Sequence, residues 1–123
     1  MQLIEAINKI DALKPNTYSP DEKIWWLSEL DGMIKKEIID THEGGESVVF
    51  NGYDSDTPEN TELLVPAPHT SIYLYWLEAK MDYRNGEYGK YNNSMIAYNS
   101  AYSAFERAYN RSHMPLTKSF KYF

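Results

Sequence analysis

Apolar side chains recur every three or four positions in four stretches of the chain, and this spacing predicts four helices. The second stretch has a clear beginning, because Ser19 is a good N-cap, Pro20 suits the first helical position and Glu22 completes a capping box. Proline and Asn-Gly pairs mark the other boundaries. The expected helices are residues 2–13, residues 19–41, a third from Thr70 or Ser71 to the Asn85-Gly86 stop, and residues 87–112.

Residues 42–65, between the second and third helices, do not follow the helical pattern. The β-prone run Val48–Phe50 precedes Asn51-Gly52, and Asn-Gly is a strong hairpin signal. The next stretch, DSDTPENTE, is typical of an acidic exposed loop. We therefore expect an all-α fold: a compact four-helix bundle with an irregular or β-hairpin insertion between helices two and three. Residues 1–115 would form one helical domain, and residues 116–123 a basic aromatic tail.

An aromatic stripe runs along the fourth expected helix in steps of three and four. Such steps occur in coiled coils, but the flanking positions lack the alternating charges that select a partner helix. A line of alanines beside the stripe widens the apolar face, which is typical of a helix in a globular core. We interpret the stripe as core, with tyrosine hydroxyls at its edge and the two end tyrosines exposed. Its members are Tyr88, Tyr91, Met95, Tyr98, Tyr102, Phe105 and Tyr109.

Two adjacent tryptophans, Trp25 and Trp26, lie in the second expected helix. Neighbouring residues of a helix point about 100° apart, so the two rings face different surroundings. We expect one ring to pack inward and the other to lie at a boundary or an interface, where tryptophan is enriched.

The charge of the chain is unevenly distributed. The net charge is −6, residues 46–70 hold five acidic and no basic residues, and residues 71–123 hold seven basic and four acidic ones. This acidic body argues against a general nucleic-acid binder, because phosphate contacts dominate that affinity. No run approaches the roughly 20 apolar residues that cross a bilayer, and the amphipathic start is unlike a signal peptide. We expect a soluble, cytosolic protein.

The sequence shows no constellation typical of catalysis or metal binding. Cysteine is absent, and His42, His69 and His113 share no ligand spacing. The acidic loop has Glu59 where a calcium-binding EF-hand needs glycine. We expect no cofactor, no metal and no enzymatic activity; an enzyme with an unrecognised carboxylate pair is the alternative.

Residues 7–38 and 62–115 resemble the head-tail connector (adaptor, or head-completion) proteins of tailed phages and prophages of Gram-positive bacteria. The stretches that carry this resemblance are ELLVPAP, YWLEAKMDYRNGEYGKYNN and AYSAFERAY. One departure is His69, where the family pattern has an aromatic residue after PAP. The acidic loop and the tail match least.

The resemblance implies a non-enzymatic virion protein that forms a homo-oligomeric ring below the portal and continues the DNA channel. Its place would be the head-tail interface, and the host cytoplasm before assembly. Its partners would be the portal and neighbouring head-tail proteins, with only non-sticking contact with packaged DNA and none with membranes. A small soluble phage or prophage interaction or regulatory protein without a virion role is the alternative. The expected contact residues are Trp25, Tyr53, Asp54, Asp56, Arg107, Arg111, Lys118, Phe120 and Lys121.

The tail PLTKSFKYF leaves two interpretations open. It is either a frayed end or an arm that adds to a neighbour's sheet or groove.

Overall fold

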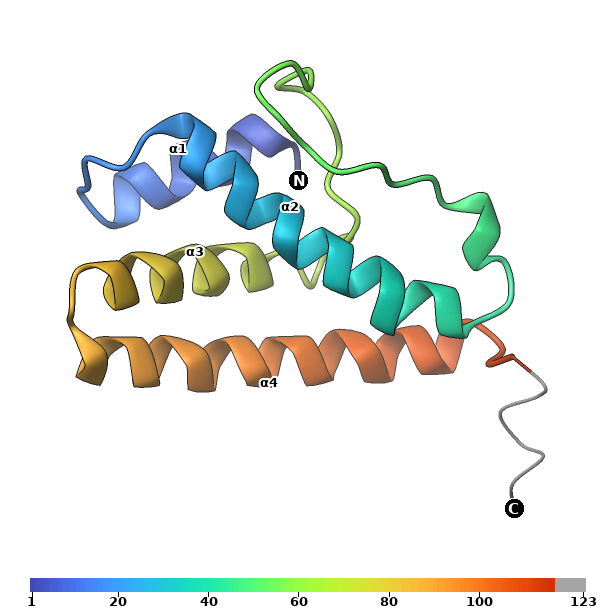
Figure 1. The fold of residues 1–123 in the computed structure, drawn as a ribbon. Coiled ribbons are helices and arrows are strands. Elements are labelled where there is room, and N and C mark those ends of the chain that lie inside the picture. Colours follow the sequence, from blue (N-terminus) through green and yellow to red (C-terminus); the bar gives the residue numbers. More distant parts are fainter. Residues whose placement is uncertain (117–123) are drawn as a thin grey trace.

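The computed structural model describes residues 1–116, and this part of the chain is all-α. Figure 1 shows α3 between the first two helices on one side and α4 on the other. α3 contacts each of the other three long helices. The expectation of an all-α fold with four helices is therefore confirmed. The helices are α1 (Leu3–Leu13), α2 (Pro20–Glu37), α3 (Ser71–Arg84) and α4 (Tyr88–Ser112), with two short 3-10 turns, η1 (Ile39–Thr41) and η2 (Gly45–Ser47).

Local signals set most of the helix ends. Ser19 caps α2, since its Oγ accepts a hydrogen bond from the Glu22 N–H at 3.2 Å, and Pro20 is the first helical residue. Gly86 separates α3 from α4 with a φ of 75°, a left-handed conformation that glycine adopts without strain. The two helices form the expected antiparallel pair (Figure 1). α2 ends at Glu37, earlier than predicted, because the chain tightens into η1.

The hydrophobic core lies on both sides of α3. Buried residues occur around most of this helix, as expected for a helix that is covered on two faces. α1 and α2 supply aliphatic side chains and Trp26, whereas α4 supplies only aromatic ones. The fully buried large side chains include Ile10, Leu27, Leu30, Ile34, Ile72, Tyr73, Leu77 and Met81.

The aromatic stripe of α4 is part of this core in its middle section. Tyr98 and Phe105 are 6% and 3% exposed, and Tyr102 is half-buried, with its hydroxyl donating to Glu37 Oε1 at 2.6 Å. Of the two ends, Tyr88 is 60% exposed, as expected. The prediction for Tyr109 is wrong: it is half-buried, because its ring stacks on His113 at 3.8 Å and meets His42 edge-on at 4.9 Å.

The insertion of residues 42–65 contains no β-hairpin, so that alternative is wrong and the irregular one is correct. Gly52 has the positive φ of a turn, 88°, but the residues around it do not pair with each other. They lie along α2 instead, where the Tyr53 N–H donates to Ser28 Oγ at 2.9 Å. The Leu64 N–H also bonds to α2, at Asp31, whereas main-chain groups of residues 59–63 bond to residues 1–4 at the start of the chain. The segment therefore pairs with α2 and the chain start rather than within a hairpin.

A buried carboxylate on α2 fixes the path of the insertion. Asp31 is 0% exposed and accepts hydrogen bonds from the Tyr53 hydroxyl at 2.5 Å, the Tyr73 hydroxyl at 2.7 Å and the Leu64 N–H at 3.1 Å. The Tyr73 hydroxyl in turn accepts from the Val65 N–H at 2.7 Å. Asp31 forms no ion pair with any residue between 1 and 116. Three hydrogen-bond donors therefore hold this carboxylate without a cation.

The pKa of Asp31 should lie above its ordinary value of 3.8 in the folded protein. Burial raises this pKa, and the hydrogen bonds from Tyr53, Tyr73 and Leu64 only partly oppose the effect. Because the folded-state pKa is raised, Asp31 stabilises the fold most at a pH below its unfolded-state pKa of 3.8. Its contribution to stability falls as the pH rises through the folded-state pKa. An NMR titration of the side-chain carboxyl carbon, assigned with Asp31→Asn, checks this. A folded-state pKa below 3.8 would show that the hydrogen bonds outweigh burial.

Candidate functional site

The two adjacent tryptophans of α2 divide as predicted. Trp26 is 4% exposed and its ring meets Tyr18 edge-on at 5.5 Å. Trp25 is 66% exposed, and its ring contacts no other aromatic ring of residues 1–116. A single exposed apolar ring is common on folded surfaces, so its surroundings decide whether it marks a contact with another molecule.

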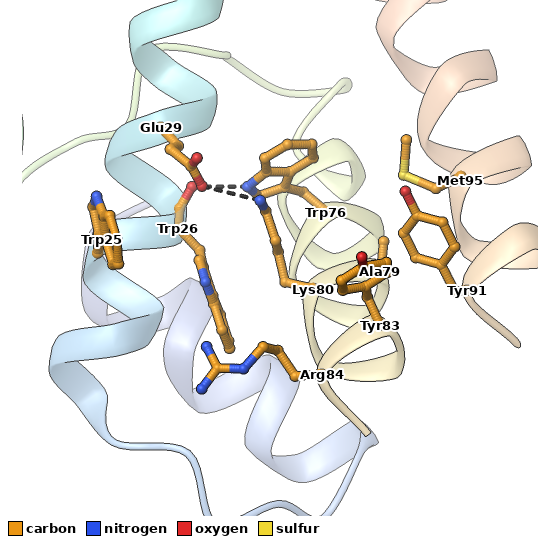
Figure 2. A pocket seen from close by; sticks show the side chains of 10 residues that line it. All are labelled: Trp25, Trp26, Glu29, Trp76, Ala79, Lys80, Tyr83, Arg84, Tyr91 and Met95. Atoms are coloured by element: carbon orange, nitrogen blue, oxygen red, sulfur yellow. Dashed lines mark hydrogen bonds and ion pairs between the residues drawn. The ribbon is translucent and has the colours of Figure 1, made fainter. Parts of the chain in front are cut away.

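A groove of about 560 Å³ lies beside Trp25, between α2, α3 and α4 (Figure 2). We call it the Trp25 groove. Its volume falls within the range of about 300–1,000 Å³ that is common for ligand sites. Aromatic side chains from all three helices form most of its wall. The lining residues are Trp25, Trp26, Glu29, Trp76, Ala79, Lys80, Tyr83, Arg84, Tyr91 and Met95.

Two cations of α3 belong to this groove. Lys80 Nζ lies 4.6 Å from the Trp76 ring and 3.1 Å from Glu29 Oε1, a pair that Figure 2 shows with a dashed line. Arg84 lies over Tyr18 and Trp26, and its nearest carboxylate oxygen, on Glu22, is 3.6 Å away. The Lys80 and Arg84 side chains are 31% and 50% exposed, so both ion pairs are partly solvated and contribute little energy. Both positive charges thus remain available to a partner.

Trp76 holds the floor of the groove in place. Its Nε1–H donates to the Trp26 carbonyl oxygen at 2.8 Å, and its ring lies 5.0 Å from that of Tyr98. This bond crosses from α3 to α2, and the ring contact reaches α4. The groove is therefore formed by the packed core itself, and binding needs no rearrangement of these helices.

A second, smaller hollow lies on the other side of Trp25. Its volume is about 320 Å³, and we call it the acidic hollow because its charged lining residues are both aspartates. Asp54 Oδ1 accepts from the Asp56 N–H at 2.9 Å in a tight turn, so the main chain of Asp56 adjoins the hollow, although Asp56 is not one of its lining residues. Asp21, Asp54 and Asp56 are all exposed. The lining residues are Asp21, Ile24, Trp25, Tyr53, Asp54 and Ser55.

The structure brings together only part of the predicted contact residues. Trp25, Tyr53 and Asp54 line the acidic hollow, with Asp56 next to it. Tyr53 also has a structural role, since it is half-buried and its hydroxyl is bound to Asp31.

The remaining predicted contact residues lie elsewhere. Arg107 and Arg111 are exposed on α4, one helical turn apart, and line neither the groove nor the hollow. Lys118, Phe120 and Lys121 lie outside the described residues.

Sequence reasoning treated the third helix only as core and missed its part in the groove. Trp76, Lys80 and Tyr83 are four and three positions apart, so they lie near one face of α3, and Arg84 follows Lys80 by one turn. This alternation of aromatic and basic residues on one helical face was a usable signal.

The segment that leads to the tail is tied to the start of the insertion. The Glu43 N–H donates to the Met114 carbonyl oxygen at 2.7 Å, and the Leu116 N–H donates to the Thr41 carbonyl oxygen at 3.1 Å. His42, which is buried, meets Asn110 Oδ1 through Nε2 at 2.7 Å. The chain therefore leaves the helices beside η1, at the opposite end of α4 from the Trp25 groove (Figure 1).

Within residues 1–116, no cluster of three or more histidine or acidic side chains is placed to hold a metal ion. The helices of this part of the chain are also too short or too polar to cross a membrane. Comparison with protein-family models, curated proteins and solved structures gives no match for the chain. The candidate site is therefore defined by its geometry alone: an aromatic groove with two cations, an exposed tryptophan and a neighbouring acidic hollow.

Proposed function

We propose that this protein is a structural component of a tailed-phage particle, a head-tail connector that binds other proteins through its surface. The observation that carries the proposal is the exposed Trp25 beside a preformed aromatic groove. Tryptophan, tyrosine and arginine are enriched in protein interfaces and in their hot spots, and all three line this groove. The proposed assembly, a head-tail connector ring, comes from the resemblance of residues 7–38 and 62–115 to connector proteins.

Each exposed element has a place in this proposal. The connector would form a ring below the portal, and the acidic insertion would face the DNA channel or a neighbouring subunit. Exposed carboxylates at Asp54, Asp56 and Glu59 would repel DNA phosphates and let the DNA slide, because binding to DNA depends on neutralising those phosphates. Residues 116–123 would reach the portal or the next ring. Finding residues 54–62 on the outer rim of an assembled ring would exclude the channel role.

Mixing the purified protein with purified portal should add a ring that negative-stain electron microscopy resolves. Trp25→Ala should reduce the fraction of portals with this ring, because it removes the exposed anchor of the groove. Ile96→Ala is the matched control: Ile96 is 69% exposed on α4, does not line the groove, and its loss should have no effect.

Wild-type protein that never decorates the portal, and is never found in assembled particles, would contradict the connector role. The position of the gene gives an independent check. A place just downstream of portal and capsid genes fits the proposal, whereas a place among lysogeny regulators fits an interaction protein without a virion role.

A further inference from the structure

We propose that the Trp25 groove is filled by a second copy of this chain, whose acidic hollow lies against it in a reciprocal two-fold pair. The inference rests on the proposed function only in treating the groove as a protein contact, and it names the partner. It concerns the isolated protein before assembly, and it is tested there: the pair occupies the groove that the proposed function uses on the portal, so the two copies would separate before a ring forms.

The first argument is charge complementarity. The basic residues that line the groove are Lys80 and Arg84. Lys80 pairs with the lining residue Glu29, and Arg84 pairs with Glu22, which does not line the groove. The hollow is lined by Asp21 and Asp54 with no basic residue, and Asp56 adjoins it. One side of Trp25 is therefore positive and the other negative. Complementary surface charges of this kind orient two partners and accelerate their encounter.

The second argument is the arrangement of the two surfaces. Trp25 lines both the groove and the hollow, so they are neighbours that share one residue. In a two-fold pair the same patch contacts itself in reverse. An axis near Trp25 would set each copy's aspartates against the other copy's Lys80 and Arg84, making both charge contacts at once.

The third argument is the apolar surface that this pairing covers. Trp25 and Tyr83 are 66% and 57% exposed, and both line the groove. A two-fold pair buries both tryptophans between the grooves at the centre of the contact. Central, fully covered aromatic residues are the ones that dominate binding energy.

The chemistry of the groove disfavours other ligands. A cationic ligand would be repelled by Lys80 and Arg84, which lie over the Trp76 and Trp26 rings. A nucleic acid would need a larger basic surface, without three aspartates next to it. A partner with carboxylates and an aromatic ring can pair with the cations and the aromatic wall of the groove. The chain itself carries both kinds of group side by side, at Asp54 and Trp25.

Sedimentation equilibrium of the isolated protein should show a monomer–dimer equilibrium. The dimer should weaken in about 0.5 M salt, which shortens the Debye length to roughly half of its value at physiological ionic strength. Trp25→Ala should raise the dissociation constant at least about 30-fold, the effect of losing an interface hot spot. Ile96→Ala should leave it unchanged.

A charge-swap experiment identifies the contact. A Lys80→Glu/Arg84→Glu variant and an Asp21→Lys/Asp56→Lys variant should each lose self-association, because like charges then face each other. An equimolar mixture should recover a one-to-one pair, since both contacts between the variants are attractive. Circular dichroism checks that each variant is folded. If the reversed groove variant does not fold, Lys80→Gln/Arg84→Gln removes the charges instead and should weaken the dimer at least about tenfold.

Three results would overturn the inference. These are a wild-type protein that stays monomeric at millimolar concentration and low salt, a charge-swapped mixture that does not pair, or assemblies that grow beyond two copies. A monomeric protein that still forms rings on the portal would refute the two-fold pair and leave the connector role intact. A dimer that never binds portal would refute the connector role and leave the two-fold pair intact.

Discussion

Replacing Asp31 with alanine is expected to lower the free energy of unfolding by about 3–5 kcal/mol, because it leaves one buried and two partly buried donors without an acceptor. The donors are the hydroxyls of Tyr53 and Tyr73 and the Leu64 N–H. Each unsatisfied buried group costs about 1–3 kcal/mol, and the removal of the carboxylate's own burial cost offsets part of the sum. Urea denaturation followed by circular dichroism measures the loss.

Two companion variants make the Asp31 experiment specific. Asp21→Ala removes a carboxylate from the same helix, but Asp21 is exposed, so the change should stay within about 1 kcal/mol. Tyr73→Phe removes one donor and deprives the Val65 N–H of its acceptor, which should cost about 1–3 kcal/mol. An Asp31→Ala protein as stable as Asp21→Ala would show that the network does not hold the insertion.

Truncating Phe105 to alanine should cost about 3–5 kcal/mol, the usual loss for a buried aromatic side chain. Phe105 is 3% exposed in the middle of α4, and its ring packs against His69 at 5.7 Å and Tyr109 at 5.8 Å. Removing the ring should leave a cavity, because other contacts hold α3 and the insertion in place and prevent them from filling the space. Urea denaturation with an unchanged m-value is the measurement.

Ile96→Ala is the matched control for Phe105→Ala. Ile96 lies on the same helix but is 69% exposed, so its truncation should change the free energy of unfolding by no more than about 0.5 kcal/mol. Equal losses at the two positions would contradict the burial of the aromatic stripe and with it the packing of α4.

Much of the fold could be predicted from the sequence because its signals are local. A cap such as Ser19 acts over three residues, as its bond to Glu22 shows. A proline or a glycine such as Gly86 acts at its own position, and helical periodicity acts over one turn. The split of Trp25 and Trp26 follows from the same periodicity. These interactions persist whatever the rest of the chain does.

The path of the insertion could not be predicted in this way. Asn51-Gly52 favours a hairpin, but a hairpin needs two strands that pair, and the tertiary contacts of Tyr53 with Ser28 and Asp31 outweigh the local preference. The same holds for Tyr109, which sequence position suggested was exposed and which His42 and His113 cover.

By itself, the sequence determined the four helices, the Ser19 cap of α2 and the apolar faces that drive the helices together. Only the tertiary structure decided that Asp31 is buried and bound by groups 22, 33 and 42 residues away. It also decided that Lys80 and Arg84 of α3 lie beside the tryptophans of α2, and that Asp54 comes to the other side of Trp25. The physical reason is range: capping and periodicity act over a few residues, whereas a groove or a buried carboxylate exists only where distant segments meet.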